Sequence, residues 1–157
     1  MGKIRQVHGS TGEEDLMAEI KIEIDIQDAM DTLDALNALV TSESLGDAAG
    51  AFAVERILTR TISGRDVNDA SSASYSPSYA KFKGGIVNLV MSGEMLGSVD
   101  YQAQGQSATI QCASETAQYH EGGTSKMPQR QFMGLSESDK SDMVDELFMK
   151  PLQEMVG

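Results

Sequence analysis

The chain has 157 residues, a length suited to one domain that buries about 70% of the surface of its unfolded form. Acidic residues outnumber basic ones by 24 to 12, giving a formal charge of −12 that argues against sequence-independent binding of duplex nucleic acid, which requires neutralised phosphates. No segment approaches the roughly 20 apolar residues of a membrane span and the start lacks a signal-peptide core, so we expect a soluble protein made in a reducing cytoplasm.

The first residues predict an arm followed by a strand. Residues 1–15 mix glycine, charged and polar residues without a period, which predicts a mobile N-terminal arm, whereas residues 16–157 form a single α+β structural domain. At 19–26, apolar and charged residues alternate with the period of two that is typical of a half-buried strand. The apolar positions of this strand are Ile20, Ile22, Ile24 and Ile26.

Two amphipathic helices follow the strand. From Asp28 to about Val40, apolar residues recur at three- and four-residue steps, and a second helix, capped by Ser42 or Ser44, carries apolar residues as far as Ile62. Gly46 and Gly50 lower its helix propensity but permit a close helix neighbour. The short link between the two helices predicts an αα-hairpin packed on the sheet.

The stretch from Ser63 to Pro77 is rich in Ser, Asp, Asn and Gly and predicts a loop. Its acidic residues invite comparison with a calcium-binding loop. That interpretation fails because Ser71 and Pro77 stand where such a loop requires glycine and glutamate. The acidic residues of this loop therefore do not predict a metal site.

A β-hairpin is predicted in the middle of the chain. Its strands are expected at 99–102 and 108–113, joined by a loop around Gly105, with Ala108, Ile110 and Cys112 on one face of the second strand. The neighbouring elements are an apolar run at 86–91, a short helix at 92–98 and a helical turn at 115–119. Cys112 is the only cysteine, which excludes an intrachain disulfide, and its apolar setting predicts an inert thiol.

The stretch from Tyr119 to Ser136 combines features that a simple core element does not need together. Gly122 and Gly123 allow backbone angles closed to other residues, and Pro128 fixes its own φ and favours an extended residue before it. Ser136 then predicts the N-cap of a last helix at about 137–155. The order is a glycine turn, a short extended run and a helix start, which a plain connector would also show.

The last helix carries an apolar face and one interruption. Pro151 removes a backbone donor, which predicts a kink or an end near Met149. The apolar face comprises Met143, Val144, Leu147, Phe148, Leu152 and Met155. The elements together predict an α+β fold, in which an N-terminal strand and a helical hairpin pack on a small antiparallel β-sheet, with a C-terminal helix.

Few residues of this chain have the spacing that catalysis requires. His120 and Glu121 resemble the start of a zinc-binding HExxH helix, but Gly122 and Gly123 follow and no second histidine completes the motif. Neither a GxSxG elbow nor a GxxxxGK[ST] phosphate loop is present. We therefore expect no catalytic residues, no cofactor and no metal, and the remaining enzymatic alternative is a host-cell cytoplasmic binding module or enzyme that uses His120 and Glu121.

Three blocks of the second half resemble one known family. Ser74–Gly85, SYSPSYAKFKGG, is similar to the family's "SPxYAKxK" segment, and Asn88–Val99, NLVMSGEMLGSV, is similar to its "L-x-x-[ST]-G-x-[ML]-x-x-S" turn. Tyr119–Asp139, YHEGGTSKMPQRQFMGLSESD, is similar to its "HxxGG…[IM]PxRxFLGLS" signature, with Met133 in place of leucine. The family is the phage virion morphogenesis proteins, which are the tail-completion or neck proteins of Mu-like and related tailed phages.

The resemblance implies a non-enzymatic structural virion protein, assembled as a homo-oligomeric ring, a hexamer, at the head–tail junction. Its partners would be neighbouring neck or connector proteins and tail-tube or terminator proteins. DNA would pass through the lumen without specific binding, which suits an acidic chain with no basic patch. The alternative in the same structural class is a tail terminator that caps the tail tube.

The third block supplies the candidates for an assembly interface. We expect an exposed Arg130 to form an ion pair with another subunit or protein, so that Arg130→Ala impairs assembly while helicity stays intact. Phe132 and Leu135 hold the extended run against the sheet or the adjacent subunit, and burial wholly within one subunit is the alternative for both. The full candidate set is His120, Gly122, Gly123, Pro128, Arg130, Phe132, Met133 and Leu135.

Overall fold

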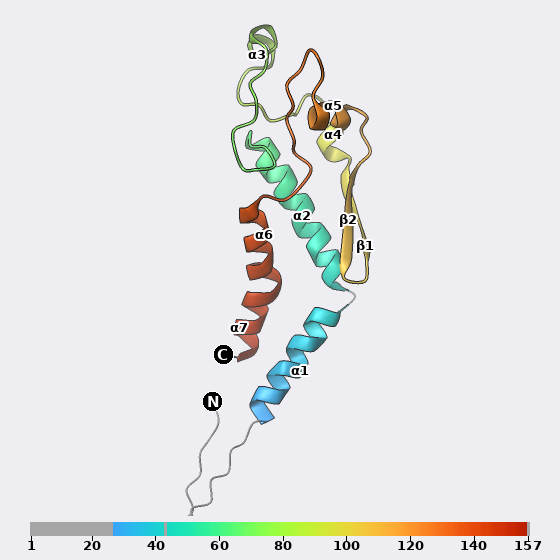
Figure 1. Cartoon of the computed structure of the whole chain (residues 1–157), viewed down its shortest axis with the longest axis vertical. Helices are drawn as coiled ribbons and strands as arrows, with labels where there is room; N and C mark the ends of the chain where they lie inside the picture. Colours follow the sequence, from blue (N-terminus) through green and yellow to red (C-terminus); the bar gives the residue numbers. More distant parts are fainter. Residues whose placement is uncertain (1–26, 43, 157) are drawn as a thin grey trace, which may run out of the picture.

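The computed structural model describes residues 27–42 and 44–156 as an elongated arrangement of helices around one β-hairpin (Figure 1). The predicted arm at 1–15 and the predicted strand at 19–26 lie outside the described residues. The elements are α1 (Gln27–Thr41), α2 (Ser44–Ile62), α3 (Pro77–Lys83), α4 (Glu94–Gly97), β1 (Val99–Gln104), β2 (Ser107–Cys112), α5 (Thr116–Gly122), α6 (Glu137–Val144), the π-helix η1 (Asp145–Met149) and α7 (Lys150–Val156). Helices, a small antiparallel sheet and a C-terminal helix confirm the predicted α+β class.

The sheet described by the structure is the hairpin β1–β2. Its strands pair antiparallel, with Tyr101 opposite Ile110 and Gln104 opposite Ser107, so the loop between them is a tight turn. Gly105 has a positive φ of 58°, which the turn requires and which glycine adopts at no steric cost. Ala108, Ile110 and Cys112 are half-buried while the residues between them are exposed, as the alternation in the sequence predicts.

Helix α2 lies against the hairpin because two of its glycines remove the side chains that would hold it away. A Cβ at Gly46 would lie 2.4 Å from the carbonyl oxygen of Gly105, and a Cβ at Gly50 would lie 2.2 Å from the Tyr101 ring. The Gly46 amide also donates to the Gly105 carbonyl at 3.2 Å. The close neighbour that these glycines permit is therefore the hairpin. Of the two helices predicted to pack on the sheet as a hairpin, α2 does so, whereas α1 extends past the end of α2 and contacts α7 (Figure 1).

The hydrophobic core lies where α2 meets α4, α5, the start of β1 and the segment that follows α5. Ile57 and Phe132 are its most deeply buried apolar residues, each with 1% of its surface exposed. The other members of the buried cluster are Leu89, Met95, Leu96, Val99 and Ala117. Leu89 adopts a φ of 53°, an unusual value for a residue with a side chain, so the apolar run at 86–91 forms a bend that turns one leucine inward.

The C-terminal helix continues through Pro151 to Val156, so of the kink or end predicted near Met149 the end is wrong. Proline lacks the amide that would donate into the preceding turn, and the five residues of η1 before it adopt the wider π-helical hydrogen bonding. Several apolar side chains of α1 and of the C-terminal helix stay exposed in the single chain: Met30, Leu33, Val40, Val144, Met149 and Met155. Across the described part of the chain, no helix combines the length and apolar character needed to span a membrane.

Two local features of residues 63–83 differ from or extend the prediction. Helix α3 was not predicted; it begins at Pro77, with the Tyr79 amide donating to the Ser76 hydroxyl at 3.4 Å. In the loop before it, the Asp66 carboxylate accepts from the amides of Asn68 and Ala70 at 2.8 and 3.0 Å. Asp66 therefore stabilises a turn of its own backbone.

Candidate assembly site

The predicted glycine turn forms a narrow loop, residues 123–129, at the end of α5. Gly123 has a φ of 68°, and a Cβ there would lie 2.9 Å from the backbone nitrogen of Gln129. Two backbone hydrogen bonds close the loop, from the Thr124 amide to Met127 at 2.8 Å and from the Met127 amide to Thr124 at 3.2 Å. The special backbone requirement falls on Gly123 alone, because Gly122 ends α5 without a positive φ.

Glu121 holds the chain where it returns from this loop. Its carboxylate oxygen Oε1 accepts hydrogen bonds from the amides of Phe132 and Met133, at 2.7 and 2.8 Å. The Arg130 amide donates to the His120 carbonyl at 2.8 Å, so the returning segment is tied to α5 at two places. Hydrogen bonds to a carboxylate are stronger than neutral ones, and Glu121 thus has a structural task in the extended run.

Arg130 is buried, with 3% of its surface exposed, so the prediction of an exposed arginine is wrong. Its Nε donates to the Ala73 carbonyl at 2.6 Å and its Nη2 to the Ser74 carbonyl at 2.7 Å. The guanidinium carbon lies 5.0 Å from the centroid of the Tyr75 ring, which adds a cation–π contact. Arg130 therefore joins the returning segment to the loop before α3 within the same chain, and the expected loss of assembly with intact helicity does not follow for Arg130→Ala.

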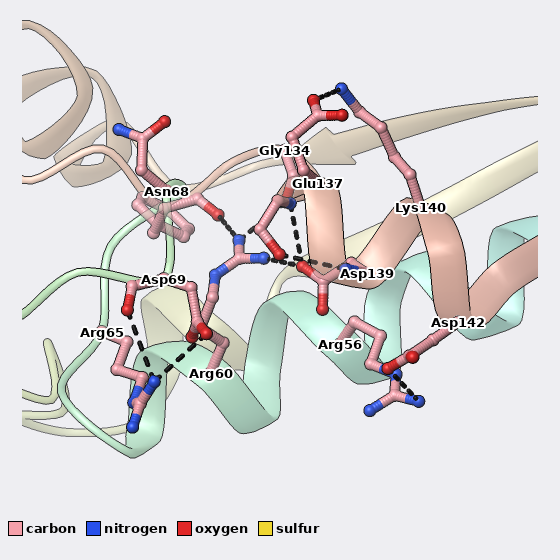
Figure 2. A network of polar contacts seen from close by, with 12 residues as sticks. Arg56, Arg60, Arg65, Asn68, Asp69, Gly134, Glu137, Asp139, Lys140 and Asp142 are labelled. Carbon is pink, nitrogen blue, oxygen red and sulfur yellow. Dashed lines mark hydrogen bonds and ion pairs between the residues drawn. The ribbon is translucent and has the colours of Figure 1, made fainter.

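A second buried arginine fixes the following residues (Figure 2). Arg60 of α2 forms an ion pair with Asp139, and its Nη2 donates to the carbonyls of Phe132 and Gly134 at 3.0 and 2.7 Å. Asp139 also accepts from the Ser136 amide at 2.9 Å, and Ser136 accepts from the Asp139 amide at 3.1 Å. These last two bonds are a capping box, which confirms Ser136 as the N-cap and places Asp139 in both the cap and the ion pair.

A cleft of about 600 Å³ opens beside the loop 123–129, and all three blocks of the family-like pattern contribute to it. The first block supplies Tyr75 and Tyr79, the second Leu89 and Met91, and the third His120, Lys126, Met127, Pro128 and Arg130. The walls are mainly apolar, with the Tyr79 hydroxyl near the Met91 sulfur at 3.5 Å. Segments far apart in sequence thus build one surface feature at the end of the molecule that carries α3 and α5 (Figure 1).

The apolar character of this end continues outside the cleft. Phe82 is 73% exposed and Met91 is 65% exposed, and the Phe82 ring lies 6.3 Å from that of Tyr79. Ile86 and Tyr119 are exposed as well. Large apolar side chains exposed together are characteristic of surfaces that bind other molecules, and a partner at this end stays a prediction.

His120 lines the cleft in a setting that favours its neutral form. Burial lowers the pKa of the imidazole below its ordinary value, and the neighbouring Arg130 guanidinium acts in the same direction, while Glu121 opposes both. Its Nδ1 is buried without a hydrogen-bond partner. Within residues 27–42 and 44–156, no group of three or more metal-ligating side chains gathers, at His120 or elsewhere.

The eight predicted site residues lie between His120 and Leu135 in the sequence, and the structure gives them different surroundings. Arg130 and Phe132 are buried within the chain; His120, Gly123, Met133 and Leu135 are half-buried; Gly122 and Pro128 are exposed. Contact of any of them with another subunit stays a prediction. The sequence did not single out Arg60 or Asp139, and it singled out Glu121 only for the enzymatic alternative; of the three, only Asp139, three residues after a capping serine, had a local signal for its structural role.

Comparisons of this chain with protein-family models, with curated proteins and with solved structures found no match.

Proposed function

We propose that the protein is a structural virion protein of a tailed bacteriophage, a ring-forming neck or tail-completion subunit that joins head to tail. The observation that carries the proposal is the convergence of the three family-like blocks on one cleft. The first two blocks are neighbours in sequence, but the β-hairpin separates them from the third, and nothing in their local patterns requires the third to meet the others. Their meeting supports the view that the resemblance reflects a shared working surface.

The cleft end has the properties of a surface that contacts a different protein. Its rim carries Phe82 and Met91, and Met127 lies on its wall, so much of the contact would be apolar and adaptable. Beneath this rim, Arg130 and Glu121 fix the loop by charged hydrogen bonds, which pre-organises the surface. We assign this end to the contact with the next protein of the neck.

The opposite end supports contact between copies of the chain. Met30 and Leu33 of α1 are 50% and 64% exposed, and apolar residues of the C-terminal helix are exposed near them in the part of the chain where α1 contacts α7. An amphipathic helix whose apolar side chains remain in water gains free energy by burying them against a neighbour. Repetition of one such contact around a closed ring is the proposed assembly.

The alternative of an enzyme at His120 and Glu121 finds less support in the geometry. A general base must reach a substrate proton, but Glu121 Oε1 already accepts two backbone amides that fix the extended run. Replacing that carboxylate would disturb the loop itself. We therefore favour a role in assembly for this pair.

The proposal is tested by removing the protein from a phage that encodes it and examining the particles by electron microscopy. A neck subunit is required for joining, so DNA-filled heads and tails of normal length should accumulate separately. Tails of uncontrolled length would instead indicate a tail terminator, because a cap stops growth of the tube. Complete, infectious particles would contradict both roles.

A further inference from the structure

Among residues 27–42 and 44–156, no further strand pairs with the outer edge of β2. Within the described residues the sheet contains β1 and β2 alone, so β2 pairs on one side only. In an antiparallel pair, residues that hydrogen-bond across the ladder alternate with residues that do not. The Ala113 amide donates to the Ser98 carbonyl at 3.3 Å, so Ala113, directly after β2, is one of the residues that bond across the ladder, and with the register this fixes which residues of β2 do so. The peptide groups of Ala108, Ile110 and Cys112 consequently point away from β1, toward the open edge.

An apolar groove of about 350 Å³ lies along the inward face of β2. Its walls come from α2, β2, the segment after Phe132 and α6, and they include Ala49, Ala53, Ala108, Ile110, Leu135 and Met143. The strand residues that line the groove, Ala108 and Ile110, both belong to β2. The groove therefore lies next to the β2 edge of the hairpin and not next to the β1 edge. A strand added to the β2 edge would therefore direct alternate side chains into an apolar hollow.

One segment of this chain has the matching pattern. Residues 19–26, which lie outside the described residues, alternate isoleucine with Lys21, Glu23 and Asp25. Four isoleucines at two-residue steps suit the groove beside Ala108 and Ile110, and the charged positions would lie on the same face as exposed Thr109 and Gln111. These neighbours are uncharged, so the charged positions would meet no like charge on β2.

The length of α1 decides which copy supplies the strand. Residues 19–26 directly precede Gln27, the residue that begins α1 at its end remote from the hairpin (Figure 1). The 15 residues of α1 rise about 22 Å, and eight extended residues span about 27 Å at most. A strand that folded back along its own α1 would use nearly its full length to reach the turn end of β2, leaving almost nothing to pair.

We propose that residues 19–26 of one subunit pair with the open β2 edge of the next, with the isoleucine face in the groove between α2 and α6. Each subunit then donates one strand and receives one, a head-to-tail contact that generates a closed ring when the rotation between subunits completes a circle. This inference rests on the proposed ring assembly and names the segment that joins its members.

The test uses the full-length chain and native mass spectrometry. Ile24→Asp removes the donor face, with Glu23→Gln on the opposite face as its control. Ala49→Glu blocks the groove while keeping a good helix former, with the exposed neighbour Ala48→Glu as its control. Circular dichroism checks that all four variants retain the helical signal of the wild type.

The wild type and both controls should have the mass of the ring, and Ile24→Asp and Ala49→Glu should each be monomeric. Mixed one to one, these two variants should form a dimer and nothing larger, because only one competent donor and one competent groove remain. Ring mass in both variants, a mixture that stays monomeric, or a monomeric wild type would overturn strand exchange. The neck role is judged separately, from the phage that lacks the protein.

A second measurement needs no substitution. Amide hydrogen exchange at Ile110, whose amide faces the open edge, should slow when the wild type is concentrated from monomer to ring. Equal exchange in the two states would overturn the proposal.

Discussion

Arg60 occupies a position where one side chain connects three parts of the molecule. Buried in α2, it pairs with Asp139 at the start of α6 and donates to two carbonyls of the intervening segment. We expect Arg60→Ala to lower the free energy of unfolding by about 3–5 kcal/mol, because Asp139 would be left buried and without its partner. Urea denaturation followed by circular dichroism measures this change.

Arg65 provides the matched control for that substitution. Its guanidinium pairs with Asp69 at 3.1 Å, but the two side chains are 55% and 42% exposed and lie close to Arg60 in space (Figure 2). Solvent-exposed ion pairs contribute about 0.5 kcal/mol to the free energy of unfolding. Arg65→Ala should therefore scarcely change the midpoint of urea denaturation. Equal losses in the two variants would contradict the role assigned to the buried pair.

His120 predicts a pH dependence of stability. Burial lowers its pKa in the folded chain, so between that value and the unfolded value of 6.5 the unfolded chain binds more protons. The stability contribution is complete above pH 6.5 and is lost as the pH falls through this window. Thermal melts should therefore drop more between pH 7.5 and 5.5 for the wild type than for His120→Gln, and parallel losses would argue against the assignment.

The burial of Arg130 could not be predicted from the local sequence pattern. An arginine in a polar loop is normally exposed, and the carbonyls that hold this one belong to Ala73 and Ser74, more than fifty residues earlier. Ser136 was predictable because a cap bonds within its own helix turn. Local requirements are visible in the sequence, whereas a buried polar contact depends on the tertiary structure.

Helices and strands were likewise predictable where the signal is local, and not where tertiary packing decides. The periodicity of 28–40 and 108–113 predicted α1 and β2 because apolar alternation follows from the geometry of each element. Helix α3 was overlooked although Ser76 and Pro77 form a helix-start signal. The π-helix before Pro151 had no comparable signal, since several adjustments can accommodate a proline and packing decides among them.

The contact between α2 and the hairpin predicts that an alanine substitution lowers stability much more at Gly46 than at Gly97. Gly46→Ala would force a Cβ to 2.4 Å from the Gly105 carbonyl, an overlap with backbone that should cost about 1–3 kcal/mol. Gly97→Ala, in α4, meets nothing within 4 Å and should change stability by less than about 0.5 kcal/mol. Denaturation midpoints compare the two variants; similar values would mean that α2 does not need this close approach.

At the scale of the whole molecule, charge bears on the proposed passage of DNA. The chain carries a formal charge of −12, so the proposed ring should repel a duplex in its lumen and hold no phosphates. We expect no binding of a fluorescently labelled duplex by the recombinant protein at about 0.15 M salt, measured by anisotropy. Saturable binding under these conditions would contradict a lumen that passes DNA freely.

The elongated shape gives the proposed subunit two ends with separate tasks. One end presents the cleft and its apolar rim, and the other presents α1 and the C-terminal helix with exposed methionine, leucine and valine side chains (Figure 1). Apart from α3, the sequence predicted the helices and strands of both ends, but it did not predict the separation of the ends, which depends on how α1 extends past α2. A subunit with two such ends can contact its neighbour in a ring and a different protein along the axis.

The most direct test of the central claim is quantitative mass spectrometry of purified, intact particles of the phage that encodes this chain. A structural neck subunit must remain in the particle, so the protein should be present at the copy number of a single ring relative to the tail-tube protein. Its absence from intact particles would contradict the account.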